Sequence, residues 1–166
     1  RRTRETSSLN VLIGGEVVNS VSVESPQPIH SAGGLGIPMP IHATAAGKAL
    51  VAWRTPEEIR HLLPLRLEQY TPDTITDVEQ FMEDLAAVRE RGYSMANGEL
   101  AVDLAALSAP IRDATGAIVG AISIAAPTSR VSQEKIPQLV TELLQTAHEA
   151  SSALGYCNGS VDVAAD

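Results

Sequence analysis

A stretch of ten residues rich in glycine and proline, Ser31–Pro40, divides the chain and restricts what can lie on either side of it. Glycine and proline disfavour the interior of helices and sheets, so we expect a loop here. A loop of this length in a compact domain is often functional. Apolar residues before the loop follow a strand-like pattern, and those after it recur at helical spacing. The chain is therefore expected to mix strands and helices.

The segment before the loop predicts a β-hairpin. Ser8–Ile13 and Glu16–Glu24 are rich in β-branched residues, and the two glycines between them are a turn signal. After the loop, His42–Trp53 consists largely of alanine and other small residues, which predicts a helix.

Two further helices have N-terminal signals. Thr55 is followed by a proline and, three residues on, by a glutamate, and Thr76 is followed by Glu79. A threonine with a glutamate three residues later predicts a capping box. The first of these helices should end at Pro64 and the second at Gly92, because proline and glycine commonly terminate helices.

The last third of the chain predicts a second hairpin and a final helix. Leu100–Ile111 and Ala117–Ala126 are apolar on both faces, which is typical of strands at the centre of a sheet. Ser132 is expected to cap a helix that runs to about Leu154. The order β-β-α-α-α-β-β-α predicts an α+β domain in which helices pack on the faces of an antiparallel sheet.

Length and charge limit the class of protein. The chain has 166 residues, enough for one domain, which we place at 1–156 with a disordered tail at 157–166. Its 12 basic and 20 acidic residues give a net charge of −8, and aromatic residues make up 3%. Such a domain is a poor candidate for binding nucleic acid by itself. The basic cluster of Arg1, Arg2 and Arg4 is either a surface tail or the remnant of a longer segment.

Several other classes are disfavoured. The sequence shows no apolar run near the ~20 residues of a membrane span and no signal peptide. A single cysteine, Cys157, permits no internal disulfide, so we expect a cytoplasmic protein. The four histidines show no zinc-binding spacing, and we expect no metal and no cofactor.

Motifs for phosphate binding and nucleophilic catalysis are incomplete. Gly47 and Lys48 are followed by Ala49, where a phosphate-binding loop needs Ser or Thr. Ser123 lacks the glycine two residues later that a nucleophile elbow requires. The chain is therefore expected not to be an enzyme. The small residues at 43–47 could let a ligand approach the N–H groups of a helix start, or they could serve only tight helix packing.

Several segments resemble those of a known family. Pro40–Leu50, Thr71–Thr76, Glu90–Tyr93 and Ala109–Asp113, together with the first hairpin, resemble the C-terminal effector-binding domain of IclR-family bacterial transcriptional regulators. The resemblance implies a GAF-like fold that binds a small-molecule effector and forms dimers or tetramers. It also implies an N-terminal helix-turn-helix domain, absent from this chain, through which DNA would be bound.

The resemblance also implies the site. It places N–H donors at Ala45 and Ala46 and a hydrogen-bond partner at Ser123. We also expect the N–H of Gly47 to donate to the ligand and Asn97 to lie near the rim. Positions that are polar in family members binding small oxo-acids fall on alanines, and the implied apolar wall comprises Met39, Ala96, Leu104, Ala106 and Ala125. A small hydrophilic acid would lose its hydration there without gaining polar partners, which is unfavourable. We therefore expect an apolar or aromatic effector with one anionic or carbonyl group.

Two alternative functions stay open: a small enzyme that uses the same pocket, and an oligomerisation module whose pocket is filled. For the sensor, the expected mechanism is a population shift, in which the effector changes how the subunits are arranged and so how the regulator binds promoters.

Overall fold

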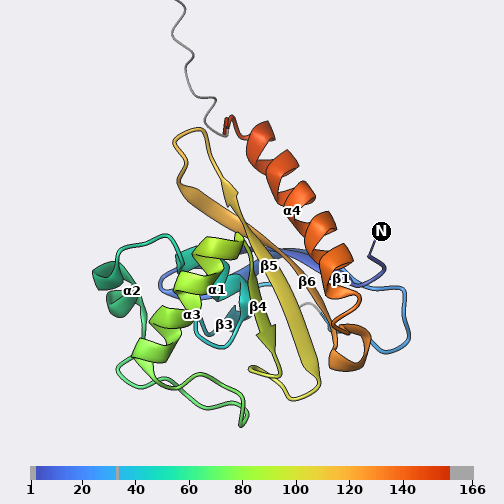
Figure 1. The fold of residues 1–166 in the computed structure, drawn as a ribbon, viewed down its shortest axis with the longest axis horizontal. Helices are drawn as coiled ribbons and strands as arrows, with labels where there is room; N and C mark the ends of the chain where they lie inside the picture. Colours follow the sequence, from blue (N-terminus) through green and yellow to red (C-terminus); the bar gives the residue numbers. More distant parts are fainter. Residues whose placement is uncertain (1–2, 33, 158–166) are drawn as a thin grey trace, which may run out of the picture.

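The computed structural model describes residues 3–32 and 34–157. They form one antiparallel sheet of six strands in the order β3-β2-β1-β6-β5-β4, with helices on both faces (Figure 1). The elements in chain order are β1 (Thr6–Ile13), β2 (Glu16–Val23), β3 (Pro38–Met39), α1 (Ala45–Val51), α2 (Pro56–Leu62), α3 (Val78–Arg91), β4 (Ser94–Asn97), β5 (Leu104–Arg112), β6 (Ile118–Pro127), a short 3₁₀ turn (Thr128–Arg130) and α4 (Ile136–Ala153). The expected α+β class is confirmed.

Both expected hairpins are present. The first consists of β1 and β2, and the second of β5 and β6. Strand β6 also pairs with β1, so the two hairpins form one continuous sheet with β1 and β6 at its centre. The second hairpin therefore lies in the interior of the sheet, which explains why both of its faces are apolar.

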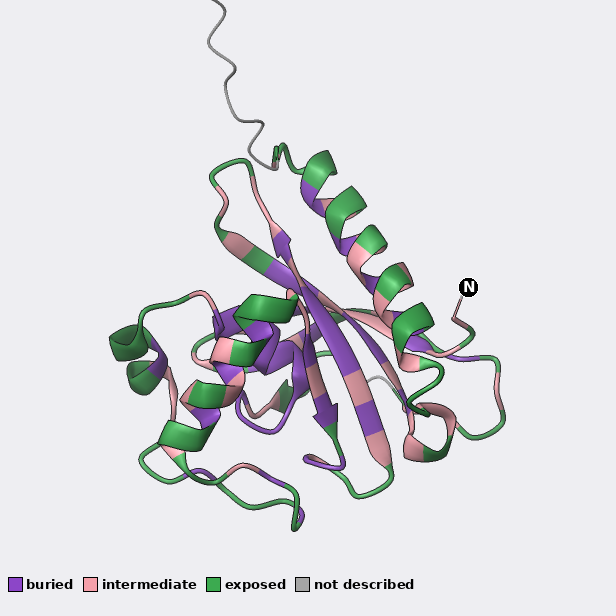
Figure 2. Cartoon of the chain, in the orientation of Figure 1, coloured by how far each residue is buried: buried purple, intermediate pink, exposed green. Residues whose placement is uncertain are grey.

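Alternate residues of the second hairpin face two separate cores. Leu107 and Ile124 pack against Leu139 and Leu143 of α4 on one face. On the other face, Ala121 joins a larger core formed with α1, α2 and α3. The period-two alternation of strand side chains thus divides one hairpin between two helical layers. Figure 2 shows the buried residues concentrated along this hairpin and on the inward sides of the helices.

Helix starts agree with the sequence signals in one case and differ in three. The capping box at Thr55 is formed as expected. Helix α3 is capped by Asp77 instead of Thr76, because the Asp77 carboxylate accepts from Gln80 N. Helix α1 begins three residues into the expected segment, after its N-cap Thr44. Ser132 does not cap α4, which begins at Ile136 without a side-chain cap.

Two short strands were not predicted, and one strand starts later than expected. Strand β3 lies inside the glycine- and proline-rich segment, and β4 follows α3 directly. Each has at most four residues, too few for a hydrophobic period to show. Strand β5 starts at Leu104, since residues 98–103 form a turn. The expectation of a disordered tail falls on residues 158–166, outside the described part of the chain, apart from the exposed Cys157.

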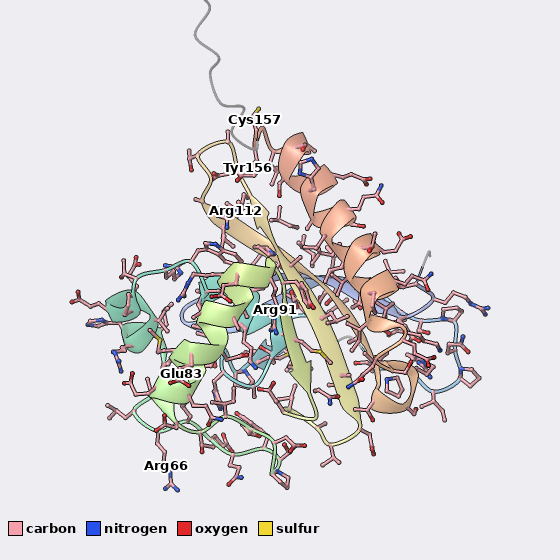
Figure 3. All side chains as sticks on the ribbon, viewed as in Figure 1. Arg66, Glu83, Arg91, Arg112, Tyr156 and Cys157 are labelled. Atoms are coloured by element: carbon pink, nitrogen blue, oxygen red, sulfur yellow. The ribbon has the colours of Figure 1, made fainter. Side chains whose placement is uncertain are left out.

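Arg112 connects two segments that are distant in the chain. Arg112 lies at the end of β5 (Figure 3). Its guanidinium lies 4.8 Å from the centre of the Trp53 ring and donates to Gly116 O, so it connects the end of β5 to the region after α1. Among the described helices, none combines the length and apolar character that crossing a membrane would need.

Candidate ligand-binding cavity

A cavity of about 100 Å³ lies between the sheet and the start of α1. Its walls come from both hairpins, from α1 and the residues before it, from β4 and the turn after it, and from the loop after β2. The lining residues are Thr6, Ser8, Asn10, Asn19, Ser31, Ala32, Gly34, Met39, Ala43, Thr44, Ala45, Ala46, Ala96, Leu100, Leu104, Ala106, Ser123 and Ala125. The volume is of the same order as the roughly 150 Å³ that accommodates benzene in an engineered cavity.

Most residues expected at the site lie together around this cavity. Met39, Ala45, Ala46, Ala96, Leu104, Ala106, Ser123 and Ala125 all line it. The pairing of β5 with β6 places Ala106 opposite Ala125, and the pairing of β4 with β5 places Ala96 opposite Ala106. Three alanines that replace polar residues of the family pattern are thus neighbours on one wall.

Gly47 and Asn97 do not line the cavity. The Gly47 N–H donates to the hydroxyl of the N-cap Thr44 at 3.1 Å, so it is not free for a ligand. A Cβ at Gly47 would lie 2.2 Å from the carbonyl oxygen of Ile41, so this glycine allows close packing. Asn97 is exposed, because alternation along β4 directs Ala96 inward and Asn97 outward.

Ala45 and Ala46 contribute backbone donors to the cavity wall. They are the first two residues of α1, where N–H groups have no acceptor within the helix. Among the described residues, none accepts a hydrogen bond from either N–H. The donors expected from the sequence are therefore present, at two of the three positions.

Polar side chains from the first hairpin form a wall that sequence reasoning missed. Thr6, Ser8 and Asn10 alternate along β1 and face the cavity, and Asn19 joins them from β2. A usable signal was present, since Ser8 and Asn10 alternate with Leu9 and Val11. The pocket is consequently more polar than its alanines alone indicate.

This wall continues into a directed chain of hydrogen bonds. Asn10 Nδ2 donates to Ser123 Oγ at 2.9 Å, Ser123 Oγ donates to Ser108 Oγ at 2.8 Å, and Ser108 Oγ donates to the carbonyl of Ile122 at 3.0 Å. Each hydroxyl has one proton. Because Ser123 uses its proton on Ser108, it can only accept a hydrogen bond from a ligand.

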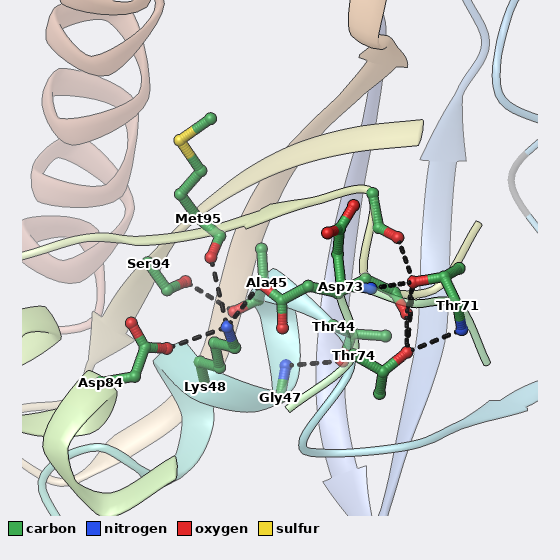
Figure 4. Close-up of polar contacts among 12 residues, drawn as sticks. Thr44, Ala45, Gly47, Lys48, Thr71, Asp73, Thr74, Asp84, Ser94 and Met95 are labelled. Atoms are coloured by element: carbon green, nitrogen blue, oxygen red, sulfur yellow. Dashed lines mark hydrogen bonds and ion pairs between the residues drawn. The ribbon is translucent and has the colours of Figure 1, made fainter. Parts of the chain in front are cut away.

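A buried ion cluster lies next to the cavity, between α1, α3 and the turn after β4. Lys48 Nζ lies 2.8 Å from Asp84 Oδ2 of α3 and 2.7 Å from Glu99 Oε1. Burial raises the pKa of Glu99, against the lowering effect of Lys48. Glu99 lies just before the lining residue Leu100, so the cluster fixes the turn after β4 relative to α1 and α3. Figure 4 shows Lys48 and Asp84 in contact.

Two threonine hydroxyls hold the same turn from its other side. Thr71 Oγ1 donates to the carbonyl of Gly98, and Thr74 Oγ1 donates to that of Glu99, both at 2.6 Å. Figure 4 shows the two threonines side by side. The turn that carries Leu100 is thus held by several separate contacts.

The cavity is built for binding by neutral groups. No charged side chain is found among the described residues that line it. Across the described chain, no group of three or more His, Cys, Asp or Glu side chains is placed to hold a metal ion. A concave pocket with largely apolar walls, a few directed polar groups and free backbone N–H groups is typical of a small-molecule-binding domain.

Comparison with known proteins identifies the family. The model of the family described as "Bacterial transcriptional regulator IclR C-terminal" matches residues 1–152, and the chain belongs to this family. The HTH-type transcriptional regulator KdgR of Escherichia coli K12 is 32% identical over 157 residues, which cover 94% of this chain and 60% of KdgR. The HTH-type transcriptional repressor AllR of the same strain is 34% identical over 152 residues, covering 91% of this chain and 56% of AllR. The chain thus spans somewhat more than half the length of these relatives.

Solved structures share the fold. The C-terminal domain of E. coli KdgR has a TM-score of 0.84 at 31% identity, with 94% of this chain and 91% of that chain covered. The inducer-binding domain of a PobR double mutant from Acinetobacter, solved with 3-hydroxybenzoic acid, has a TM-score of 0.82 at 31% identity, with 90% and 89% covered. The relatives are transcriptional regulators, and one of these structures is of an inducer-binding domain with a bound small molecule.

Proposed function

We propose that this domain senses a small-molecule effector in the cavity beside α1 and does so for a transcriptional regulator. The observation that carries the proposal is the cavity itself. It is lined by Ala45 and Ala46, whose N–H groups have no acceptor among the described residues, and by the polar residues of the first hairpin, in an otherwise apolar space. The PobR domain supports it, since a related fold is there associated with an aromatic hydroxy acid.

The effector that fits best has an apolar or aromatic body and one carbonyl or carboxylate group. The wall of Met39, Leu104, Ala106 and Ala125 suits the body, because burying apolar surface stabilises the complex and leaves no polar group unpaired. The carbonyl or carboxylate would accept from the N–H groups at the start of α1. A cavity of about 100 Å³ favours a molecule no larger than a single small ring.

Catalysis at this site is the weaker alternative. General acid–base and nucleophilic mechanisms need a titratable or activated side chain within reach of the substrate. The lining offers hydroxyls and amides, and the proton of Ser123 is already donated to Ser108. A pure oligomerisation module is also disfavoured, because side chains leave the cavity open.

In the whole regulator, effector binding would change how the subunits assemble. We infer homo-oligomers, dimers or tetramers, whose arrangement shifts when the cavity is occupied, and DNA binding through a helix-turn-helix segment outside this chain. The HTH-type relatives support that inference. A regulator of promoters would act in the cytoplasm.

A ligand screen tests the proposal. We expect small aromatic acids to raise the melting temperature of the domain, and pyruvate and glyoxylate to have little effect. Light scattering with and without the best compound then tests the change in assembly. If no small molecule stabilises the domain while the folded state is intact, the sensing function is wrong.

A further inference from the structure

The side-chain oxygen of Asn19 is a buried acceptor that has no donor. Asn19 is 4% exposed and lines the cavity, yet Oδ1 is buried without a hydrogen bond from any described residue. Buried polar atoms in folded proteins are nearly always paired, so an exception in a binding cavity needs an explanation.

Three polar side chains around the cavity already donate to other acceptors. Asn10, directly opposite, donates from Nδ2 to Ser8 Oγ at 3.1 Å and to Ser123 Oγ at 2.9 Å. The Thr6 hydroxyl donates to the carbonyl of Ser31 at 2.7 Å. The Thr44 hydroxyl donates to the carbonyl of Pro40, also at 2.7 Å. The protons of these three side chains are used inside the protein, and Asn19 Oδ1 receives none of them.

The backbone holds Asn19 in this position. The register of β1 with β2 shifts between Leu9 and Asn10, because Ser20 is an extra residue in β2. This bulge puts Asn19 opposite Asn10 on the cavity face and keeps Val21 opposite Leu9 on the other face. The Asn19 carbonyl also accepts from Gly36 N at 2.9 Å, which fixes its backbone from the far side.

We propose that the effector carries a neutral hydrogen-bond donor, a hydroxyl or an amide N–H, that binds Asn19 Oδ1, and that Asn19 selects for effectors with this group. This inference rests on the proposed sensing function. It adds a second polar end to the ligand, since the start of α1 offers donors and Asn19 offers an acceptor. Lack of a charged side chain in the described lining favours a neutral donor over an ammonium group.

Two matched pairs of compounds test the inference. In each pair only one member carries a donor: phenol against toluene, and 3-hydroxybenzoate against benzoate. Binding constants come from thermal-shift titrations of the wild-type domain. We expect the member with the hydroxyl to bind about tenfold more tightly, as one well-placed hydrogen bond to an otherwise unpaired buried group allows.

Variants assign the effect to Asn19. Asn19→Leu has a side chain of similar size without an acceptor, and we expect the preference to fall below about twofold. Asn19→Asp keeps an acceptor, so the neutral pair should still favour phenol. Ser22→Ala is the matched control: Ser22 Oγ is also buried and unpaired on β2, but Ser22 does not line the cavity. Its preference should equal that of the wild type.

The outcomes separate the two proposals. If no member of either pair stabilises the wild-type domain, the sensing function itself is contradicted. If compounds bind but the paired members bind equally, or if Asn19→Leu keeps the preference, only the role of Asn19 is wrong. Circular dichroism confirms that each variant is folded, and Asn19→Ala, which also lacks the acceptor, replaces Asn19→Leu if the latter is not folded.

Discussion

Asn10 and Asn19 face each other across the first hairpin at the point where the pairing of β1 with β2 shifts register. Both are almost completely buried, at 2% and 4% exposure, and both line the cavity. Asn10 is the first donor of the hydrogen-bond chain through Ser123, whereas Asn19 Oδ1 has no partner among the described residues. Two identical residues at one bulge therefore differ in role: one completes the fold, and the other is available to a ligand.

Filling the cavity should abolish ligand binding without unfolding the domain. Ala106→Phe places a ring where the apolar part of the effector would lie, at a cost of about 1–3 kcal/mol for overpacking. We expect a folded protein whose melting temperature no longer responds to the best compound of the screen. Ala101→Phe, at an exposed position in the turn after β4, should respond like the wild type. A ligand response that survives in Ala106→Phe would place the binding site elsewhere.

Ser123→Ala should weaken both the fold and ligand binding. The change removes the acceptor for Asn10 Nδ2 and the donor for Ser108 Oγ, which are both buried. We expect a loss of about 1–3 kcal/mol in the free energy of unfolding, measured by urea denaturation. Ser129→Ala, at a position outside this chain of hydrogen bonds, is the control. If the free energy of unfolding is unchanged, the chain of hydrogen bonds through Ser123 does not contribute to stability.

Gly47→Ala should be strongly destabilising even though alanine favours helices. The added Cβ would lie 2.2 Å from the carbonyl oxygen of Ile41 and 2.5 Å from its Cα, and backbone atoms cannot move aside cheaply. We expect a loss at or above the usual 1–3 kcal/mol of overpacking, measured by chemical denaturation. At Gly120 the nearest atom is 3.4 Å away, so Gly120→Ala should cost less.

Lys48→Met should cost about 3–5 kcal/mol, because it leaves the carboxylates of Asp84 and Glu99 without their buried cation. A second change, Glu99→Gln, removes one of the unpaired charges and should restore part of the lost stability. Unfolding free energies of the wild type, both single variants and the double variant give the coupling between the two positions. Strict additivity would contradict the ion cluster.

Glu99 should also shape the pH dependence of stability. Burial raises its pKa above the ordinary value of 4.5, although Lys48 opposes the effect. An acid with a raised pKa in the folded state contributes stability that is complete below the unfolded value and is lost as pH rises through the folded value. Glu99→Gln lacks this contribution.

The contribution of Glu99 to stability can be measured from the melting temperatures of the wild type and Glu99→Gln at about pH 7.5 and about pH 5. The variant should lose stability relative to the wild type as the pH falls. A difference between the two proteins that does not change with pH would contradict the raised pKa.

The sequence predicted the long elements because their patterns repeat over many residues. Both hairpins, the capping box at Thr55 and the end of α3 at Gly92 follow from such local signals. It did not predict β3 or β4, whose hydrogen bonds depend on partners distant in the chain. The sequence also could not predict that Asp77 and not Thr76 caps α3, because both residue types commonly cap helices.

The site was predicted in part for similar reasons. A resemblance in motif placed the alanine wall and the N–H groups of Ala45 and Ala46, which the structure brings together. The N–H of Gly47 was expected to be free, but this depended on which residue caps the helix. The N-cap is Thr44, and its hydroxyl accepts the hydrogen bond from Gly47 N. The polar residues of β1 were missed although Ser8 and Asn10 alternate with Leu9 and Val11. The position of Asn19 could not be predicted, because it depends on the bulge at Ser20, and sequence alone does not reveal that register.

Seven of the residues around the cavity are alanines, at positions 32, 43, 45, 46, 96, 106 and 125. In the genetic code, one base change turns an alanine codon into valine, serine, threonine or an acidic residue. Each of these positions is thus one mutation away from a smaller cavity, a new hydroxyl or a new charge. The scaffold around them is held by contacts elsewhere, in the ion cluster at Lys48 and in the two cores of the sheet. Single substitutions at these positions can therefore change which ligand the pocket accepts while the surrounding domain stays the same.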